Sequence, residues 1–184
     1  SNLIVNVALR NWRPMAKLGI TACHYFTQHD LGIYCNIREP MRVGDTAAPF
    51  DPDRPIVLTF YIGFPSRGST RDQVVRARTR LLTTSFTTFE REIRSLLTDM
   101  FGPYGFRAQR DIAGIVLNRW GHSYVVPEPG FFHGGNGRPP LGEAMARPHG
   151  RIAFAHSELA GIQTWEEAAR FGEAAAVHAL AAGR

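Results

Sequence analysis

The residues best suited to binding an anionic ligand lie near the C-terminus. Thr164 and Glu167 have the spacing of a capping box, which predicts a helix from there to Ala182. The first N–H groups of a helix lack internal partners and carry partial positive charge, so this end can stabilise a phosphate, a carboxylate or an anionic heterocycle. Glu158 lies in the preceding loop, where a carboxylate can accept hydrogen bonds from sugar hydroxyls. The alternative is an ordinary capped surface helix with a solvated glutamate.

The elements around this helix end form a small unit. The apolar segment 151–156 (RIAFAH) predicts a short strand, and the loop SELAGIQ joins it to the helix. Ala168, Ala169 and Gly172 are small, so one face of the helix would allow a backbone or a ligand to approach closely.

The other chemistry-bearing residues form weaker patterns. None of the seven histidines stands in an HExxH motif or another recognised metal-ligand spacing, so no metal site is predicted. The segment 63–68 (GFPSRG) places its serine one position late for the GxSxG motif of hydrolases. Cys23 and Cys35 lack CxxC spacing and lie in strand-like runs, where free buried thiols and a disulfide between neighbouring strands both remain open.

Composition favours one globular chain of ordinary size. The 184 residues are 44% hydrophobic and 20% charged, which excludes a disordered tail, a collagen-like repeat and a heptad rod. The net charge of +5 comes from scattered arginines, with Lys17 as the single lysine, so no nucleic-acid-binding face is predicted. No apolar run approaches the roughly 20 residues that a membrane-spanning helix requires, so no membrane span is expected.

Hydrophobic patterning places the elements along the chain. A turn or short helix is expected over residues 10–18, ended by Gly19. A helical region with a possible cap at Thr70 breaks at Thr83–Thr88, resumes at Phe86 and ends at Gly102. Further strands are expected over Leu3–Leu9, Ile20–Thr27, Leu31–Ile37, Ile56–Phe64, Ile112–Trp120 and Ser123–Val126.

The order of these elements favours an α+β or α/β fold over regular βαβ alternation. Residues 127–150 form a long loop rich in proline and glycine, and such loops are usually functional or disordered. An apolar strand is already under way at Leu3, so we expect that an upstream part of the chain is missing.

The stretch 150–175 (GRIAFAHSELAGIQTWEEAARFGEAA) resembles the C-terminal FAD-contacting segment of the flavin amine oxidoreductases, and of their spermidine dehydrogenase-like branch above all. Three further stretches agree with this resemblance in the same order along the chain. They are residues 6–19 (NVALRNWRPMAKLG), 84–97 (TSFTTFEREIRSLL) and 118–132 (NRWGHSYVVPEPGFF).

The resemblance implies the C-terminal part of an FAD-dependent amine or polyamine oxidoreductase. Its fold would be α+β, with a mixed β-sheet substrate domain over residues 1–110. Residues 111–184 would supply the C-terminal strand–loop–helix of an FAD-binding Rossmann-like domain. The GxGxxG motif that holds the FAD pyrophosphate is expected in an N-terminal remainder of the same protein. The loop 130–137 is glycine-rich, but it does not follow a strand and open a helix, so it is no substitute.

The same resemblance implies roles for individual residues. Ser157 and Glu158 match the loop whose carboxylate meets the FAD ribityl chain, and Trp165 matches the first helical residue, whose N–H points at the flavin N1–C2=O edge. Thr164 and Ala168 complete the expected cofactor-binding residues. The expected catalytic residues, which would line the amine pocket beside the flavin, are Trp120, His122 and Tyr124.

Two positions depart from the family pattern. Thr164 stands where many members carry an aromatic wall residue, and the family's lysine, bonded through water to flavin N5, has no match at Lys17. The implied reaction transfers a hydride from the carbon next to a small neutral amine to flavin N5 and yields an imine. The alternative is a non-catalytic fragment or interaction module that does not bind FAD by itself.

Overall fold

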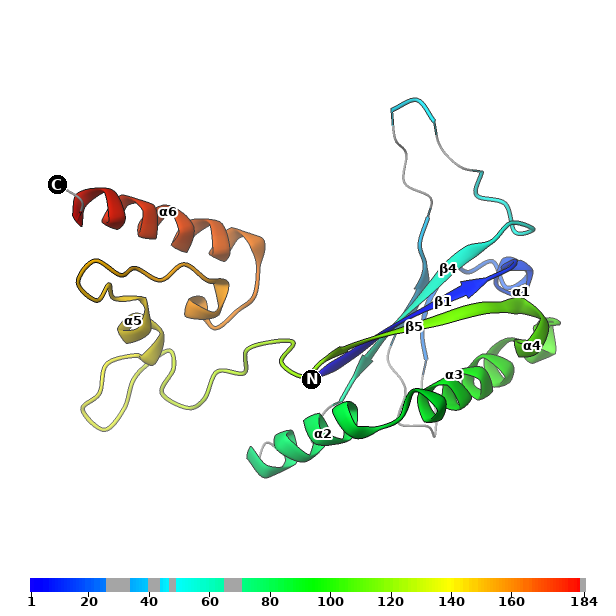
Figure 1. The fold of residues 1–184 in the computed structure, drawn as a ribbon, viewed down its shortest axis with the longest axis horizontal. Coiled ribbons are helices and arrows are strands. Elements are labelled where there is room, and N and C mark those ends of the chain that lie inside the picture. Colours follow the sequence, from blue (N-terminus) through cyan, green and yellow to red (C-terminus); the bar gives the residue numbers. More distant parts are fainter. Residues whose placement is uncertain (26–33, 40–43, 47–48, 65–70, 183–184) are drawn as a thin grey trace. The chain divides into compact units, whose positions relative to one another are not determined.

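A computed structural model of the chain describes residues 1–25, 34–39, 44–46, 49–64 and 71–182 (Figure 1). Within these ranges the chain forms two compact units, Ser1–Gly121 and His122–Arg184. The predicted helix cap at Thr70 lies outside the described residues, as do residues 26–27 and 31–33 of two predicted strands. The fold is α+β, because the first unit combines one antiparallel sheet with helices and the second is helical.

Five strands form the sheet of the first unit, in the order β2-β3-β4-β1-β5. The strands predicted over Leu3–Leu9, Ile56–Phe64 and Ile112–Trp120 are confirmed. β2 is shorter than the strand predicted over Ile20–Thr27. The strands are β1 (Asn2–Leu9), β2 (Ala22–His24), β3 (Tyr34–Ile37), β4 (Ile56–Gly63) and β5 (Ile112–Trp120).

The expected mixed sheet is wrong for the described strands, because every pairing among them is antiparallel. β4 and β5 both run antiparallel to β1, so they are parallel to each other, and α2 (Arg71–Thr83) and α3 (Phe86–Phe101) connect them. Parallel strands need such a crossover. However, β1 lies between β4 and β5 and separates them, so these strands form no parallel pair.

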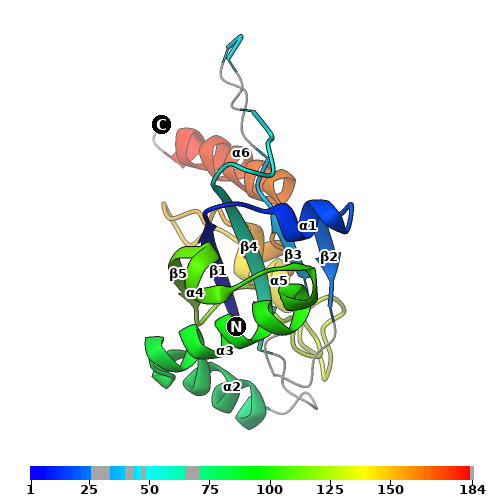
Figure 2. The same ribbon diagram turned by 90° about the vertical axis from the view of Figure 1, so that its right-hand side faces the viewer.

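The two faces of the sheet differ because successive side chains of a strand point to opposite sides. Along β1 the odd-numbered residues Leu3 to Leu9 are buried, whereas the even-numbered ones are partly exposed. The apolar side of α3 joins this buried core, and Figure 2 shows α3 alongside the sheet. The helical break is confirmed, since α2 ends at Thr83 and Ser85 caps α3 by accepting a hydrogen bond from the Thr88 N–H at 3.1 Å.

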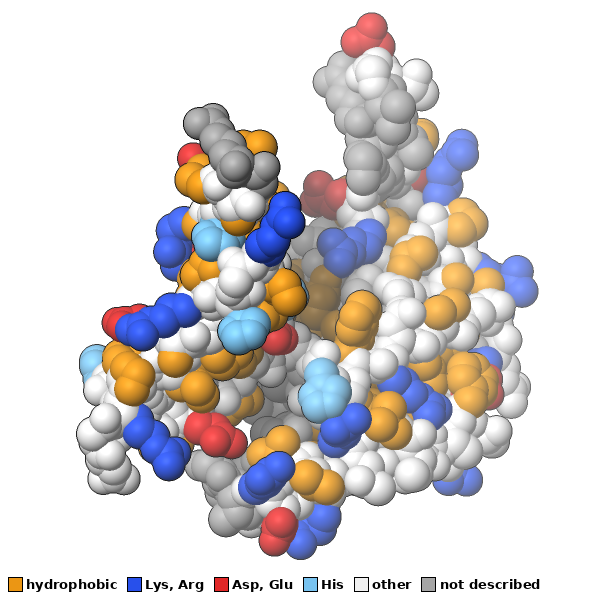
Figure 3. All heavy atoms as spheres, turned by 60° about the vertical axis from the view of Figure 1, so that its left-hand side comes forward, with side chains coloured by type: hydrophobic (Ala, Val, Ile, Leu, Met, Phe, Trp, Pro, Cys, Tyr) orange, Lys and Arg blue, Asp and Glu red, His pale blue; other side chains and the backbone are white. Residues whose placement is uncertain are grey.

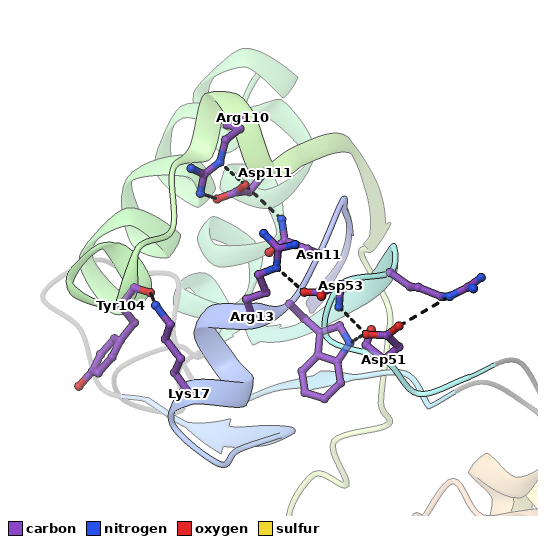
Figure 4. A network of polar contacts seen from close by, with 10 residues as sticks. Asn11, Arg13, Lys17, Asp51, Asp53, Tyr104, Arg110 and Asp111 are labelled. Carbon is purple, nitrogen blue, oxygen red and sulfur yellow. Dashed lines mark hydrogen bonds and ion pairs between the residues drawn. The ribbon is translucent and has the colours of Figure 1, made fainter.

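A network of polar contacts joins the chain just after β1 to α4 (Ala108–Asp111), the short helix that leads into β5 (Figure 4). It centres on Asp111, the last residue of α4, whose side chain is 1% exposed. Its carboxylate accepts hydrogen bonds from Arg110 Nε at 2.7 Å, from the Arg107 N–H at 2.7 Å and from Asn11 Nδ2 at 3.3 Å. The Arg110 guanidinium, with help from these other donors, holds the pKa of Asp111 below its ordinary value.

The second unit consists of α5 (Leu141–Ala146), the 3-10 turn η2 (Ser157–Ala160) and α6 (Trp165–Ala182). The predicted C-terminal helix is confirmed. The predicted strands at residues 123–126 and 151–156 are wrong: the first is irregular, and the second has one isolated bridge, between His149 and Ile152. A strand needs a neighbouring strand for its backbone groups, and the described part of this unit offers none.

The boundary between the units differs from the expected division at residue 110. β5 pairs with β1 from Ile112 to Trp120, and the first unit therefore extends to Gly121. The second unit begins at His122 and contains no strand among its described residues.

Candidate functional site

The N-terminus of α6 is accessible and carries free donors. Thr164 Oγ1 accepts a hydrogen bond from the Glu167 N–H at 3.4 Å, which forms half of the predicted capping box. Its other half is absent, because the Glu167 carboxylate pairs with Arg170 instead. The N–H groups of Trp165 and Glu166 donate to no described protein atom, and Trp165 is 80% exposed. This helix end can therefore donate two backbone hydrogen bonds to an anion.

Hydrogen bonds hold the Glu158 carboxylate beside the start of α6. Glu158 Oε1 accepts from Gln163 Nε2 at 3.1 Å, and Gln163 Oε1 accepts from the Val125 N–H at 2.8 Å. The Glu158 N–H donates to His156 Nδ1 at 3.1 Å, which fixes the turn itself. The carboxylate stays exposed, so it can accept further hydrogen bonds from a ligand.

The remaining predicted cofactor residues differ in accessibility. Ser157 is buried, with 8% of its surface exposed, whereas Ala168 on α6 is exposed. All five predicted cofactor residues lie in the second unit, between η2 and the first turns of α6. The structure therefore brings this predicted group together.

A cavity of about 480 Å³ opens beside the same helix. Phe131, Phe132 and Phe171 line it together with the ion pair of Glu167 and Arg170. The Arg170 guanidinium lies 4.2 Å from the centroid of the Phe171 ring. The residues that line this cavity do not include Trp165 or Glu158, so it is separate from the predicted ribityl and flavin-edge positions.

The predicted catalytic residues fall in different units. Trp120 is the last residue of β5 in the first unit and is 56% exposed. His122 and Tyr124 lie in the second unit, and Tyr124 is 68% exposed. All three are exposed side chains, and neither unit alone brings all three together.

Sequence reasoning missed a row of aromatic side chains on the sheet face opposite the core, here called the outer face. His24, Tyr34 and Tyr61 occupy facing positions on β2, β3 and β4. The ring centroids of His24 and Tyr34 are 4.9 Å apart, and those of Tyr34 and Tyr61 are 5.7 Å apart. The Arg38 side chain donates a hydrogen bond to the Tyr61 hydroxyl.

The next row on the outer face is polar. Thr59 Oγ1 donates to Asn6 Oδ1 at 2.9 Å, and Asn36 is the register partner of Thr59. The Asn36 Oδ1 atom is buried and has no hydrogen-bond partner among the described residues. The sequence does show polar and aromatic residues alternating with apolar ones along β3 and β4, and this pattern could have indicated the outer face. The strand order is needed to show that the outer-face residues of different strands are neighbours.

From the sequence, no cofactor contact is predicted for Lys17 or for the glycine-rich loop 130–137. Lys17 Nζ donates to the backbone oxygen of Tyr104 at 3.4 Å on the helical side (Figure 4). The glycine-rich loop 130–137 follows irregular chain rather than a strand, and several of its glycines have positive φ. In the described part of the chain, no group of three or more His, Cys, Asp or Glu side chains is arranged to hold a metal ion.

Comparison with protein families finds no family that matches this chain, and comparison with curated proteins finds no match either. Among the described residues, no helix has both the length and the apolar character that crossing a membrane requires.

Proposed function

We propose that this chain is the C-terminal part of an FAD-dependent amine oxidoreductase, acting on a small amine of the polyamine class. In this proposal the first unit is the substrate-domain portion, and the second unit contributes to an FAD-binding domain of Rossmann-like type. An N-terminal remainder of the same protein would hold the FAD pyrophosphate. When bound, FAD supplies the hydride acceptor for oxidation of the amine to an imine.

The observation that carries the proposal is the accessible start of α6. The free N–H groups of Trp165 and Glu166 fit the electron-rich N1–C2=O edge of a flavin, because a helix N-terminus stabilises negative charge there. Glu158, fixed by Gln163 and still exposed, fits the role of accepting hydrogen bonds from the ribityl hydroxyls. These residues would bind and orient the cofactor.

The side chains on the outer face of the sheet support the proposal of an amine substrate. Its aromatic row, Tyr34 and Tyr61 with His24, offers ring faces that attract a cation by cation–π interaction. Cation–π attraction favours the protonated form in which a free amine approaches. Removal of water from the bound amine would have the opposite effect, because desolvation lowers the pKa of an amine and favours the neutral form that gives up a hydride. Trp120 ends β5 on this face, since its register partner is Asn2.

The exposed hydrophobic residues of the second unit support the proposal that this chain is part of a larger protein. Among the described residues of this unit, three large hydrophobic residues are buried, Phe131, Leu159 and Phe171. Eleven others are exposed, and hydrophobic side chains stand between charged ones in Figure 3. A unit with so small a core gains much of its stability from burial against further polypeptide.

Substitution of Trp165 tests the proposed flavin contact. Proline is tolerated at the first position of a helix and removes only the N–H group, so Trp165→Pro deletes the proposed donor while α6 is retained. Trp165→Ala removes the side chain and keeps the N–H, and it is the matched control. In the full-length protein we expect Trp165→Pro to weaken FAD binding and to lower the flavin reduction potential relative to Trp165→Ala.

Spectroscopy of the full-length protein tests the activity. We expect a yellow protein with bound flavin whose absorbance is lost anaerobically when a diamine or polyamine is added. A full-length protein purified without flavin, and unable to take it up, would overturn the proposal. A flavin titration of this chain alone tests the alternative, a non-catalytic fragment or interaction module that does not bind FAD by itself. A dissociation constant below about 1 µM would contradict that alternative.

A further inference from the structure

The thiols of Cys23 and Cys35 face each other at the edge of the sheet. The two residues are direct register partners on β2 and β3, and their Sγ atoms lie 3.4 Å apart. Opposed residues of an antiparallel pair have Cα atoms about 4.5–5.5 Å apart, which lies within the range of about 4.4–6.8 Å that a disulfide spans. Both thiols are free, and the backbone already holds them where a bond can form.

The two thiols differ in accessibility and acidity. Cys35 is fully buried, whereas Cys23 on the edge strand is partly exposed. The hydrogen bond from the Cys35 thiol lowers the pKa of Cys23 to about 7, against the opposing effect of burial. The same hydrogen bond, together with burial, raises the pKa of Cys35. Cys23 is therefore the better nucleophile at neutral pH.

We propose that Cys23 and Cys35 form a reversible disulfide, which makes the β2–β3 edge a thiol-oxidation site. The oxidant is a small-molecule disulfide such as oxidised glutathione. The Cys23 thiolate attacks one sulfur of the oxidant, whose S–S bond breaks and releases one thiol. Cys35 then attacks Cys23 Sγ and releases the second thiol. The two cysteines lose two electrons and two protons in total, and both are recovered in the two small thiols.

The disulfide would stabilise the neighbouring residue pair of the same two strands. His24 and Tyr34 are the next register pair, and their rings lie on the outer face, 4.9 Å apart. A covalent link between the adjacent residues would hold β2 against β3 and keep this ring pair in place. Oxidation would thus stabilise the edge that carries part of the aromatic row.

Thiol counting on the full-length chain in mixtures of reduced and oxidised glutathione tests this proposal. Any further cysteine of the full-length protein is first replaced by serine. Cys23 and Cys35 are the only cysteines of the sequence here, so alkylation in denaturant after an acid quench labels both thiols of the reduced form and none of the disulfide form. We expect labelling to fall from two to none as the oxidant increases, with a mass loss of about 2 Da that dithiothreitol reverses. Cys35→Ser should accumulate a glutathione adduct on Cys23.

Cys23→Ser is the matched variant, and its buried Cys35 should stay unmodified while the protein is folded. Two labelled thiols across the whole series, in protein that circular dichroism shows to be folded, would overturn the proposal. Oxidation seen only as disulfide-linked dimers on a non-reducing gel would overturn it as well. Neither readout involves flavin or amine oxidation, so the result is independent of the proposed function.

Discussion

Tyr34 and Tyr61 lie directly opposite each other on β3 and β4, with ring centroids 5.7 Å apart on the outer face of the sheet. Arg38 fixes the second ring by donating a hydrogen bond to its hydroxyl, and the guanidinium lies 6.0 Å from the ring centroid. Tyr61 belongs to β4, and Arg38 directly follows β3. The pairing of these two strands therefore brings Arg38 to Tyr61 and defines the position of the ring. Such a ring is held in place before any ligand binds.

Replacement of Tyr61 therefore tests the aromatic row as an amine-binding surface, as the proposed function requires. In the full-length protein, if it oxidises an amine as proposed, we expect Tyr61→Ala to raise KM for the amine about three- to tenfold through the loss of one cation–π contact, with a smaller effect for Tyr61→Phe. Steady-state kinetics measure both. Tyr104→Ala is the matched control, because this tyrosine is 40% exposed in the turn after α3. Equal kinetic effects of the Tyr61 and Tyr104 substitutions would contradict the assignment.

Asp111 is a buried charged residue of the first unit. Asp111→Asn removes the anionic acceptor of the Arg107 N–H and of Asn11 Nδ2, so we expect a loss of about 1–3 kcal/mol in the free energy of unfolding. Urea unfolding followed by circular dichroism measures this loss. Asp53→Asn is the control, since its ion pair with Arg13 is exposed to solvent and should contribute much less to the free energy of unfolding.

The lowered pKa of Asp111 also predicts a pH dependence. Because the folded-state pKa lies below the unfolded value of about 3.9, this carboxylate contributes its full stability above that pH. The contribution is lost as the pH falls from about 4 through the folded-state pKa. Wild-type protein should lose stability over this acidic range, and Asp111→Asn should show a flatter curve. Parallel curves for the two proteins would contradict the prediction.

The sequence predicted the elements of the first unit better than their arrangement. β4 was predictable because a β-branched and aromatic run is bounded by turn residues, and α3 because Phe89, Ile93 and Leu97 recur at helical spacing. The antiparallel order was not predictable, since residue patterns do not show that β1 separates β4 from β5. The aromatic row was missed for the same reason, because it exists only after the strands pair.

In the second unit, a short apolar run led to a wrong prediction of a strand. Residues 151–156 have the apolar content of a strand, yet no strand in the described part of their unit pairs with them. The helix start near Thr164 was predictable because capping depends on residues that are close in sequence. The contacts of Glu158 with Gln163, and of Gln163 with Val125, depend on how the loop folds and could not be predicted.

Gly161 controls the loop that leads into α6. Its φ is +69°, and a Cβ atom there would lie 2.7 Å from the Phe131 ring and 2.8 Å from the Phe132 ring. Gly161→Ala therefore combines backbone strain with a clash against aromatic carbons, and we expect it to destabilise the second unit by about 2–4 kcal/mol. Hydrogen exchange of the amides from residue 122 onward measures the loss.

Gly172 is the matched control for this substitution. It lies inside α6, and a Cβ atom there meets nothing within 4 Å. Gly172→Ala should therefore stabilise the helix by about 0.5–1 kcal/mol, through helix propensity alone. Opposite signs for the two glycine-to-alanine changes are the expected result, and a neutral Gly161→Ala would show that the loop adopts another conformation.

Thr164 provides the last test, because its cap fixes where α6 begins. Thr164→Ala removes the oxygen that accepts from the Glu167 N–H, and we expect α6 to lose about 0.5–1 kcal/mol, whereas Thr164→Ser retains the cap. Ser85→Ala in the first unit should cost more, about 1–2 kcal/mol, because its capping bond is shorter, 3.1 Å against 3.4 Å. Amide exchange at the start of each helix compares the two caps. Unchanged exchange at residues 165–168 in Thr164→Ala would mean that the first turn is held by other contacts.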